Sequence, residues 1–142
     1  MKLTTRGRYG IKAMSEIAYG YNNKKCTSLK DISQKSGISE NYLEQIMSQL
    51  KKAGLVKSVR GAGGGYTLSN RPEKISLGDI LRSLEGDLAP ADCLTNSDVS
   101  CGVCDCGDCS AKPVLTKLYD SLNEVVDSVT LDSLIKKEEV II

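Results

Sequence analysis

The 142-residue sequence contains no histidine, tryptophan or phenylalanine and only 3 prolines. Without histidine the chain lacks the commonest general base, and no nucleophilic side chain has an evident activating partner, so we do not expect an enzyme. No run of apolar residues approaches the length of a membrane span, and the N-terminal residues lack the apolar core of a signal peptide. We therefore expect a cytoplasmic protein that does not contact a membrane.

Charge is unevenly distributed along the chain, although the net charge of the whole is only +1. Residues 1–71 contain 13 Lys and Arg against 4 Asp and Glu, whereas residues 72–142 contain 6 against 14. The two halves therefore carry net charges of +9 and −8. A basic surface attracts phosphate, so we expect the first half to face a nucleic acid and the acidic half to point away from it.

Two short helices joined by a tight turn are predicted in the first half. Ser28 followed by Asp31 forms a capping box, which predicts a helix that Gly37 ends. Ser39 is the N-cap candidate of a second helix, which Gly54 ends. The apolar residues of the second helix recur at helical spacing and are Leu43, Ile46, Met47 and Leu50. This arrangement predicts a helix-turn-helix, in which the second helix enters the major groove of duplex DNA.

The second helix has a polar face made of Glu40, Asn41, Glu44 and Gln45. Asn and Gln can pair bidentately with adenine, and Glu can accept a hydrogen bond from the amino group of cytosine. An ordinary solvated helix face is the alternative, because exposed helices commonly carry such residues. The segment that follows this helix decides in favour of DNA contact.

A glycine-rich hairpin is predicted directly after the second helix. Residues 55–59 and 66–68 form short strand patterns, and residues 61–65 form the turn between them. Arg60 lies at the base of this turn, where it can reach a minor groove, since narrow minor grooves attract arginine. The alternative is a flexible hairpin whose glycines merely permit positive φ. After a helix-turn-helix, we interpret the hairpin as the wing of a winged helix.

Further helical patterns flank this region. The upstream one has an apolar face of Tyr9, Ala13, Met14, Ile17 and Ala18. Arg6 and Arg8 near its start either contact phosphate or form a solvated basic terminus. The downstream one begins at a capping box of Ser76 and Asp79 and ends at Gly86. Its apolar residues, expected to pack on the core, are Leu77, Ile80, Leu81 and Leu84.

Residues 87–112 show no apolar periodicity and contain a cluster of cysteines. Its members are Cys93, Cys101, Cys104, Cys106 and Cys109. Cytoplasmic thiols stay reduced, so metal binding or thiol chemistry is expected rather than disulfide bonds. Thiolates suit zinc, copper(I) or an iron-sulfur cluster. Only Asp105 separates the two Cys-x-x-Cys pairs, which disfavours an ordinary zinc ribbon and favours an iron-sulfur cluster, with a metal-free loop as the alternative.

A long amphipathic helix is predicted after the cysteines, with Pro113 in its first turn. Its wide apolar stripe consists of Val114, Leu115, Leu118, Leu122, Val125, Val126 and Val129. Thr130 is the candidate cap of a short final helix. The long helix either folds back on its own domain or pairs with a second copy. We favour a homodimer, because helix-turn-helix proteins read twofold sites as dimers.

The predicted fold is mainly α with a small β-hairpin wing. We divide the chain into a winged helix-turn-helix DNA-binding domain at 1–86, a cysteine-rich cluster-binding loop at 87–112, and a dimerisation helix with a C-terminal tail at 113–142. Three segments carry a resemblance that covers nearly the whole chain: residues 1–10 (MKLTTRGRYG), 41–45 (NYLEQ) and 58–66 (SVRGAGGGY). Together they resemble the signature segments of the bacterial IscR/CymR family of winged-helix transcription regulators.

The resemblance implies a homodimer held by the long helix, a recognition helix near residues 40–53, and a wing in the minor groove of a double-stranded operator. The DNA-contact residues that we predict are Arg6, Ser28, Ser39, Glu40, Asn41, Tyr42, Glu44, Gln45, Arg60, Gly61 and Gly64. In IscR-like members, the residue matching Glu44 is linked to the choice between two types of DNA site. Such proteins repress iron-sulfur assembly genes when the cluster supply is adequate, and the assembly proteins are the expected source of the cluster.

IscR-like members bind a 2Fe-2S cluster through three cysteines and a histidine that precede the dimerisation helix. Counting back from Thr130 places Lys112 at the position of that histidine, and lysine is a poor cluster ligand. The ligands that we predict are Cys93, Cys101 and Cys109, with Cys104, or Cys106 as an alternative, as the fourth. A cluster of another type, zinc, or no cofactor remains an alternative.

Cys26 lies just before the helix-turn-helix and is a candidate redox site. CymR-like regulators of cysteine metabolism carry a similarly placed cysteine that can be oxidised, and they usually lack the loop cluster. The alternative function is therefore a cluster-free regulator of sulfur metabolism, controlled by a thiol switch or by a partner protein. An isolated cysteine that simply fills a hydrophobic position is the structural alternative. A thiol-rich metal carrier is a third possible function.

Overall fold

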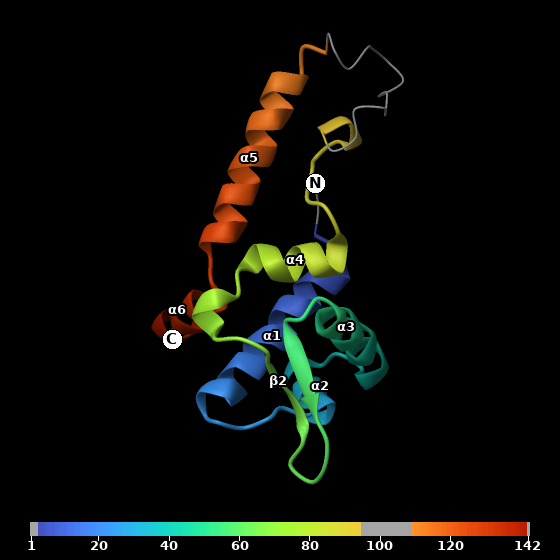
Figure 1. Ribbon diagram of the computed structural model, residues 1–142, viewed down its shortest axis with the longest axis vertical. Helices are drawn as coiled ribbons and strands as arrows, with labels where there is room; N and C mark the ends of the chain where they lie inside the picture. The colour runs from blue at the N-terminus through green and yellow to red at the C-terminus, as the bar shows by residue number, and fades with distance from the viewer. Residues whose placement is uncertain (1–2, 95–108, 142) are drawn as a thin grey trace.

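The computed structural model describes residues 3–94 and 109–141 (Figure 1). Within them the N-terminal unit is mainly helical and has one two-stranded antiparallel hairpin, as predicted. Its elements are α1 (Thr5–Asn22), α2 (Leu29–Ser36), α3 (Glu40–Lys52), β1 (Val56–Val59), β2 (Gly65–Leu68), the 3-10 turn η1 (Pro72–Lys74) and α4 (Leu77–Glu85). The elements that follow are the 3-10 turn η2 (Asp92–Leu94), α5 (Lys112–Ser128) and α6 (Leu131–Ile141).

The helix boundaries follow from the capping residues. The side chains of Ser28, Ser39 and Ser76 each accept a hydrogen bond from the backbone N–H three residues later, at the starts of α2, α3 and α4. Ser76 and Asp79 form both bonds of a capping box, as predicted. For Ser28 and Asp31 the structure shows only the serine's bond, because the aspartate side chain does not bond back to the Ser28 backbone.

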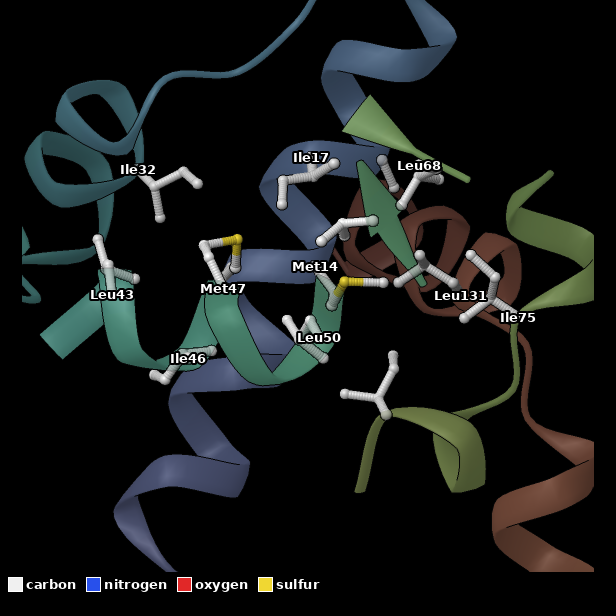
Figure 2. Close-up of a cluster of buried hydrophobic side chains, with 14 of the residues drawn as sticks. Met14, Ile17, Ile32, Leu43, Ile46, Met47, Leu50, Leu68, Ile75 and Leu131 are labelled. Atoms are coloured by element: carbon white, nitrogen blue, oxygen red, sulfur yellow. The ribbon is translucent and has the colours of Figure 1, made fainter. Parts of the chain in front are cut away.

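One apolar core joins the helix-turn-helix to the helices around it (Figure 2). Met14 and Ile17 of α1 pack with the predicted stripe of α3, whose Leu43, Ile46, Met47 and Leu50 are fully buried. Each such side chain contributes about 1.5–3 kcal/mol to the free energy of unfolding. The core therefore fixes α3 by its apolar face and leaves the polar face outside.

The C-terminal helix α6 shares this core. Leu131 is fully buried and Ile135 nearly so, and both belong to the same cluster as Met14. The start of α6 is also held by its backbone, because the Leu131 N–H donates to the Ile75 carbonyl at 2.8 Å. Residues that the sequence places in a C-terminal tail thus help to build the N-terminal unit.

The hairpin is attached to the end of α1 as well as to α3. Its register pairs Val56 with Leu68 and Val59 with Gly65. Thr27 forms an isolated bridge with Tyr66, with N···O distances of 2.9 and 2.8 Å. The segment before α2 therefore lies against β2 and fixes the base of the hairpin.

Helix α5 extends away from the N-terminal unit, on the side opposite the hairpin (Figure 1). Its C-terminal end is anchored by a 2.8 Å bond from the Leu77 N–H to the Val129 carbonyl. Val126 is buried against α4, whereas Val114, Leu118 and Val125 are 70%, 48% and 57% exposed. The apolar stripe of α5 is thus only partly covered by its own chain. None of the helices in the described ranges has the length and apolar character needed to cross a membrane.

Candidate nucleic-acid interface

The polar face of α3 is open to solvent. This predicted reading face consists of Glu40, Asn41, Glu44 and Gln45. All four are exposed, and the burial of the opposite face of α3 holds them outward. Tyr42 differs, because it is half-buried and its ring packs edge-on against the Tyr9 ring, with centroids 5.8 Å apart. The four polar side chains are free to meet base edges, whereas Tyr42 is partly occupied in fixing α3 against α1.

Arg6 of α1 shares a surface hollow with α3. The hollow is lined by Arg6, Asn41, Glu44, Gln45, Ser48 and Gln49. The structure therefore places Arg6 beside the predicted reading face, although Arg6 and Asn41 are 35 positions apart in the sequence. Among the described residues Arg6 has no ion pair that would hold it away from a ligand.

Ser48 and Gln49 are absent from the predicted contact set. They follow Glu44 and Gln45 by four residues, so extending the face by one helical turn would have found them. The Gln49 Oε1 atom is buried and has no hydrogen-bond partner in the described part of the chain. A buried polar atom without a partner is costly, so an approaching donor would relieve it.

The predicted contacts Ser28 and Ser39 are both engaged as helix caps. Their Oγ atoms accept from the N–H groups of Asp31 and Tyr42, at 3.1 and 3.3 Å. A hydroxyl that accepts such a bond can still donate its own proton to a phosphate oxygen. Ser39 also lines a hollow between the start of α1 and the turn of the helix-turn-helix, so it lies near the reading face.

Arg60 follows β1 directly and is exposed at the end of the hairpin. The turn after it closes through a 2.9 Å bond from the Gly64 N–H to the Gly61 carbonyl. Gly61 has a φ of +104°, which favours glycine. A Cβ atom on Gly64 would lie 2.3 Å from the Val59 carbonyl oxygen, so this turn also excludes side chains by close approach. The hairpin thus presents Arg60 on a narrow loop.

A polar network connects α4 to α5, away from the reading face. The Arg82 guanidinium bonds to the Asp127 carboxylate at 2.6 and 3.1 Å and to Asn123 Oδ1 at 2.8 Å. The bonds between Arg82 and Asp127 lower the pKa of Asp127 and raise that of Arg82, because each partner favours the charged form of the other. The hydroxyl of Tyr119 donates to Asp87 Oδ1 at 2.7 Å, and this bond raises the pKa of Tyr119.

The cysteine-rich region is described only at its two ends. Cys93 lies in η2 and Cys109 lies three residues before α5, and both are half-buried. Because η2 contacts α5, the two ends of the region lie at the same end of the helix (Figure 1). The other three predicted ligands, Cys101, Cys104 and Cys106, lie outside the described residues. In the ranges 3–94 and 109–141, no three Cys, Asp or Glu side chains gather closely enough to hold a metal ion.

Cys26 is a half-buried free thiol at the opposite end of the N-terminal unit. It shares an open hollow with Lys24, Lys25 and Thr67. Its neighbour Thr27 carries the backbone bonds to Tyr66 of β2. The predicted redox residue is therefore one position from the base of the hairpin and remote from the other cysteines that the structure describes.

Comparison with known proteins identifies the family of this chain. A family model described as Rrf2, iron-dependent transcriptional regulator, matches residues 3–137. The HTH-type transcriptional regulator CymR of Bacillus subtilis strain 168 is 42% identical over 134 residues, which cover 94% of this chain and 89% of that protein.

Two solved structures give the same result. The structure of CymR, the global cysteine regulator of B. subtilis, has a TM-score of 0.79 and 40% identity and covers 96% of this chain and 98% of its own. The structure of IscR from T. potens has a TM-score of 0.76 and 42% identity and covers 97% of this chain and 88% of its own. These matches confirm the predicted resemblance and the predicted fold class. The relatives are regulators rather than enzymes, and the chain belongs to the Rrf2 family of transcriptional regulators.

Proposed function

We propose that this regulator is a homodimeric repressor that binds duplex DNA through α3, Arg6 and the hairpin, and that its cysteine-rich region senses iron-sulfur cluster status to control iron-sulfur assembly genes. The observation that carries the proposal is the joint surface of Arg6 and the polar face of α3. Arg60 is exposed on the hairpin that follows α3 in the chain. Amide and carboxylate side chains read base edges, and arginines supply contacts to phosphates or narrow minor grooves.

The proposed dimer contact is the uncovered part of the α5 stripe. Val114, Leu118 and Val125 lie at the same helical face, and all three are well exposed. A second copy of α5 would remove them from water and would set the distance between two recognition helices. Half-site spacing then follows from the dimer geometry.

The proposed cluster site lies between η2 and the start of α5. Cys93 and Cys109 are soft thiol donors that the fold brings to one end of α5, which fits the donor set of an iron-sulfur cluster. Cys101 and either Cys104 or Cys106 complete the proposed ligand set, because the sequence contains no histidine. Such a cluster, when bound, is a redox-active group whose presence depends on the cell's iron and sulfide.

The protein's own contribution is the connection between this site and the rest of the molecule. Asp87 accepts the bond from Tyr119 of α5, and Arg82 holds Asp127 further along the same helix. The orientation of α5 is thereby linked to the segment that leads to Cys93. A differential affinity of about 1–3 kcal/mol between two states is enough for a useful regulatory switch.

The test is the absorption spectrum of protein purified without oxygen, normalised to protein concentration. Thiolate-ligated iron-sulfur clusters absorb broadly between about 400 and 460 nm, so we expect a coloured sample with iron and sulfide in fixed ratio to protein. A Cys109→Ala variant is expected to lose the colour, whereas Cys26→Ala is expected to keep it. A sample that stays colourless after reconstitution with iron and sulfide would overturn cluster sensing.

A cluster-free thiol regulator of cysteine metabolism is the second candidate function, and the position of Cys26 favours it. Oxidation of the Cys26 thiol would act next to Thr27, whose backbone bonds hold Tyr66 at the base of the hairpin. The similar CymR of B. subtilis is a cysteine regulator. If this function is correct, peroxide will weaken operator binding by the wild-type protein but not by Cys26→Ser.

The proposal of a thiol-rich metal carrier makes a different prediction. A carrier needs no duplex binding, whereas a regulator binds duplex DNA with sequence preference and with an affinity that falls as salt rises. Titration of a genomic promoter fragment and a scrambled duplex at two salt concentrations separates the two functions.

A further inference from the structure

The first turn of α1 is held by a side chain from α4. Both the backbone N–H and the Oγ1 hydroxyl of Thr4 donate to Oε1 of Glu85, each at 2.5 Å. Thr4 in turn caps α1, because its Oγ1 accepts from the Gly7 N–H at 3.3 Å. Glu85 thus fixes the residue that begins α1, although 81 positions of sequence separate Glu85 from Thr4.

The position of Glu85 is unfavourable for its own helix. Glu85 is the last residue of α4, where the helix dipole is negative and disfavours a carboxylate. The same carboxylate lies at the N-terminal end of α1, where the dipole is positive and favours an anion. The interaction with α1 therefore offsets the unfavourable interaction with the dipole of α4. This indicates that Glu85 stabilises the start of α1.

Gly7 allows this close approach. A Cβ atom at Gly7 would lie 2.5 Å from Oε1 of Glu85 and 2.8 Å from its Cδ. Glycine inside a helix is less favourable than alanine, so helix propensity does not explain a glycine at position 7 of α1. Space for the Glu85 carboxylate gives a physical reason for a glycine at this position.

The turn that Glu85 fixes carries Arg6. Arg6 lies between Thr4 and Gly7, and it lines the same hollow as Asn41 and Glu44 of α3. Arg6 is half-buried, so its approach to α3 depends on how the first turn of α1 is placed. The contact between Glu85 and Thr4 therefore fixes the turn that carries Arg6, and Arg6 belongs to the proposed DNA surface.

We propose that Glu85 is a positioning residue for DNA binding, which holds the start of α1 so that Arg6 stays beside the recognition helix. This inference rests on the proposed DNA-binding function. Glu85 is also two residues before Asp87, whose Oδ1 accepts bonds from Tyr119 of α5 and from the Ala89 N–H. One short segment, residues 85–89, thus links α5 to the arginine at the DNA surface.

The first test is a thermodynamic cycle of Glu85→Ala and Arg6→Ala, read as dissociation constants for one operator duplex that the wild-type protein selects from a randomised library. Networks of this kind transmit about 0.5–2 kcal/mol, so we expect Glu85→Ala to weaken operator binding by about 2- to 30-fold. In the Arg6→Ala background the same change is expected to have no further effect, because the residue that it positions is gone. Simple electrostatics predicts the opposite sign, since removing a negative charge strengthens attraction to DNA.

Glu73→Ala is the matched control for this change in charge. Glu73 is an exposed acidic residue of η1, and its side chain has no hydrogen bond or ion pair with the described residues. We expect Glu73→Ala to bind operator as tightly as the wild type or slightly more tightly. Equal effects of Glu73→Ala and Glu85→Ala on operator affinity would overturn the inference, because the effect would then not come from the contact of Glu85 with Thr4.

Gly7→Ala provides an independent variant that keeps the carboxylate. Its Cβ meets the far end of a flexible side chain, so the expected outcome is a displaced Glu85 and an intact fold. Alanine also raises helix propensity, so we expect an unchanged or higher melting temperature together with weaker operator binding. A merely structural role of Glu85 predicts that melting temperature and operator affinity fall together.

The outcomes separate this inference from the function on which it rests. If wild-type protein fails to bind any duplex, the proposed function and this inference both fail. If wild-type protein binds and Glu85→Ala binds equally well, or if the effect of Glu85→Ala persists without Arg6, this inference alone is wrong. Glu85→Gln keeps an acceptor oxygen and is expected to restore part of the affinity that Glu85→Ala loses.

Discussion

Arg82 of α4 and Asp127 of α5 form a two-point ion pair, with Nη1–Oδ1 and Nη2–Oδ2 distances of 2.6 and 3.1 Å. Gly78 makes room for it, since a Cβ atom there would lie 2.3 Å from Asp127 Oδ1. Such paired geometry fixes direction as well as distance. The angle of α5 to the N-terminal unit therefore depends on this pair.

This ion pair predicts a pH dependence of stability. The bond from Arg82 lowers the pKa of Asp127 below its usual 3.8, so the folded state binds the proton less well than the unfolded state. The stabilisation is therefore complete above pH 3.8 and is lost as pH falls through the lower folded-state value. We expect Asp127→Asn to melt at a lower temperature than the wild type at pH 6, and the difference to shrink towards pH 3.

Asp120→Asn is the control for that measurement. Asp120 is exposed on the same helix, and the structure shows no ion pair for it in the described ranges. We expect little change in its melting temperature at pH 6. If the melting temperatures of Asp127→Asn and the wild type differ by the same amount at every pH, the effect comes from packing and not from the ion pair.

Arg60→Ala is expected to weaken operator binding and to flatten the preference for narrow minor grooves. Arg60 is exposed on the hairpin turn, and arginine is attracted to the enhanced negative potential of narrow grooves. We expect a loss of about tenfold in affinity and a salt-dependence slope reduced by about 1. Titrations against operators that differ only in an A-tract measure both quantities.

Arg71→Ala is the matched control for Arg60, because Arg71 is also exposed but lies beyond β2. It is expected to change affinity less and to leave the groove preference intact. Unchanged titration curves for Arg60→Ala across these operators would remove Arg60 from the mechanism.

Glu44→Ala is expected to relax discrimination at one cytosine position. Glu44 is exposed on α3 and lines the hollow with Arg6, so its carboxylate can accept from a cytosine amino group. A lost contact of this kind reduces discrimination by about 1–3 kcal/mol. Selection from a randomised duplex library would then return a motif that is degenerate at that position, and an identical motif would refute the assignment.

Leu118→Lys is expected to shift the protein from dimer to monomer. Leu118 is 48% exposed on α5, and a second copy of α5 would bury a lysine there without a partner. Sedimentation at several concentrations measures the dimer dissociation constant, which we expect to rise by at least about tenfold. Lys117→Ala changes the adjacent exposed residue and serves as the control, and equal dissociation constants for both variants would place the interface elsewhere.

Local sequence signals predicted the elements that carry the reading face. Ser39 and the spacing from Leu43 to Leu50 place α3 correctly, because a cap and an apolar stripe act within one helix. The same signals place Arg60 next to a glycine turn. The predicted contact set ends one helical turn too early, since Ser48 and Gln49 line the same hollow as Glu44.

The sequence by itself determined the helices, the hairpin, the basic first half and the family. Only the tertiary structure decided that Arg6 lies beside Glu44, that Glu85 bonds to Thr4, and that Thr27 holds Tyr66. Helix caps and apolar periodicity depend on residues three or four positions apart, so they can be recognised in the sequence. The three tertiary pairings join residues far apart in sequence, and only the packing of α1 against its neighbours brings them together.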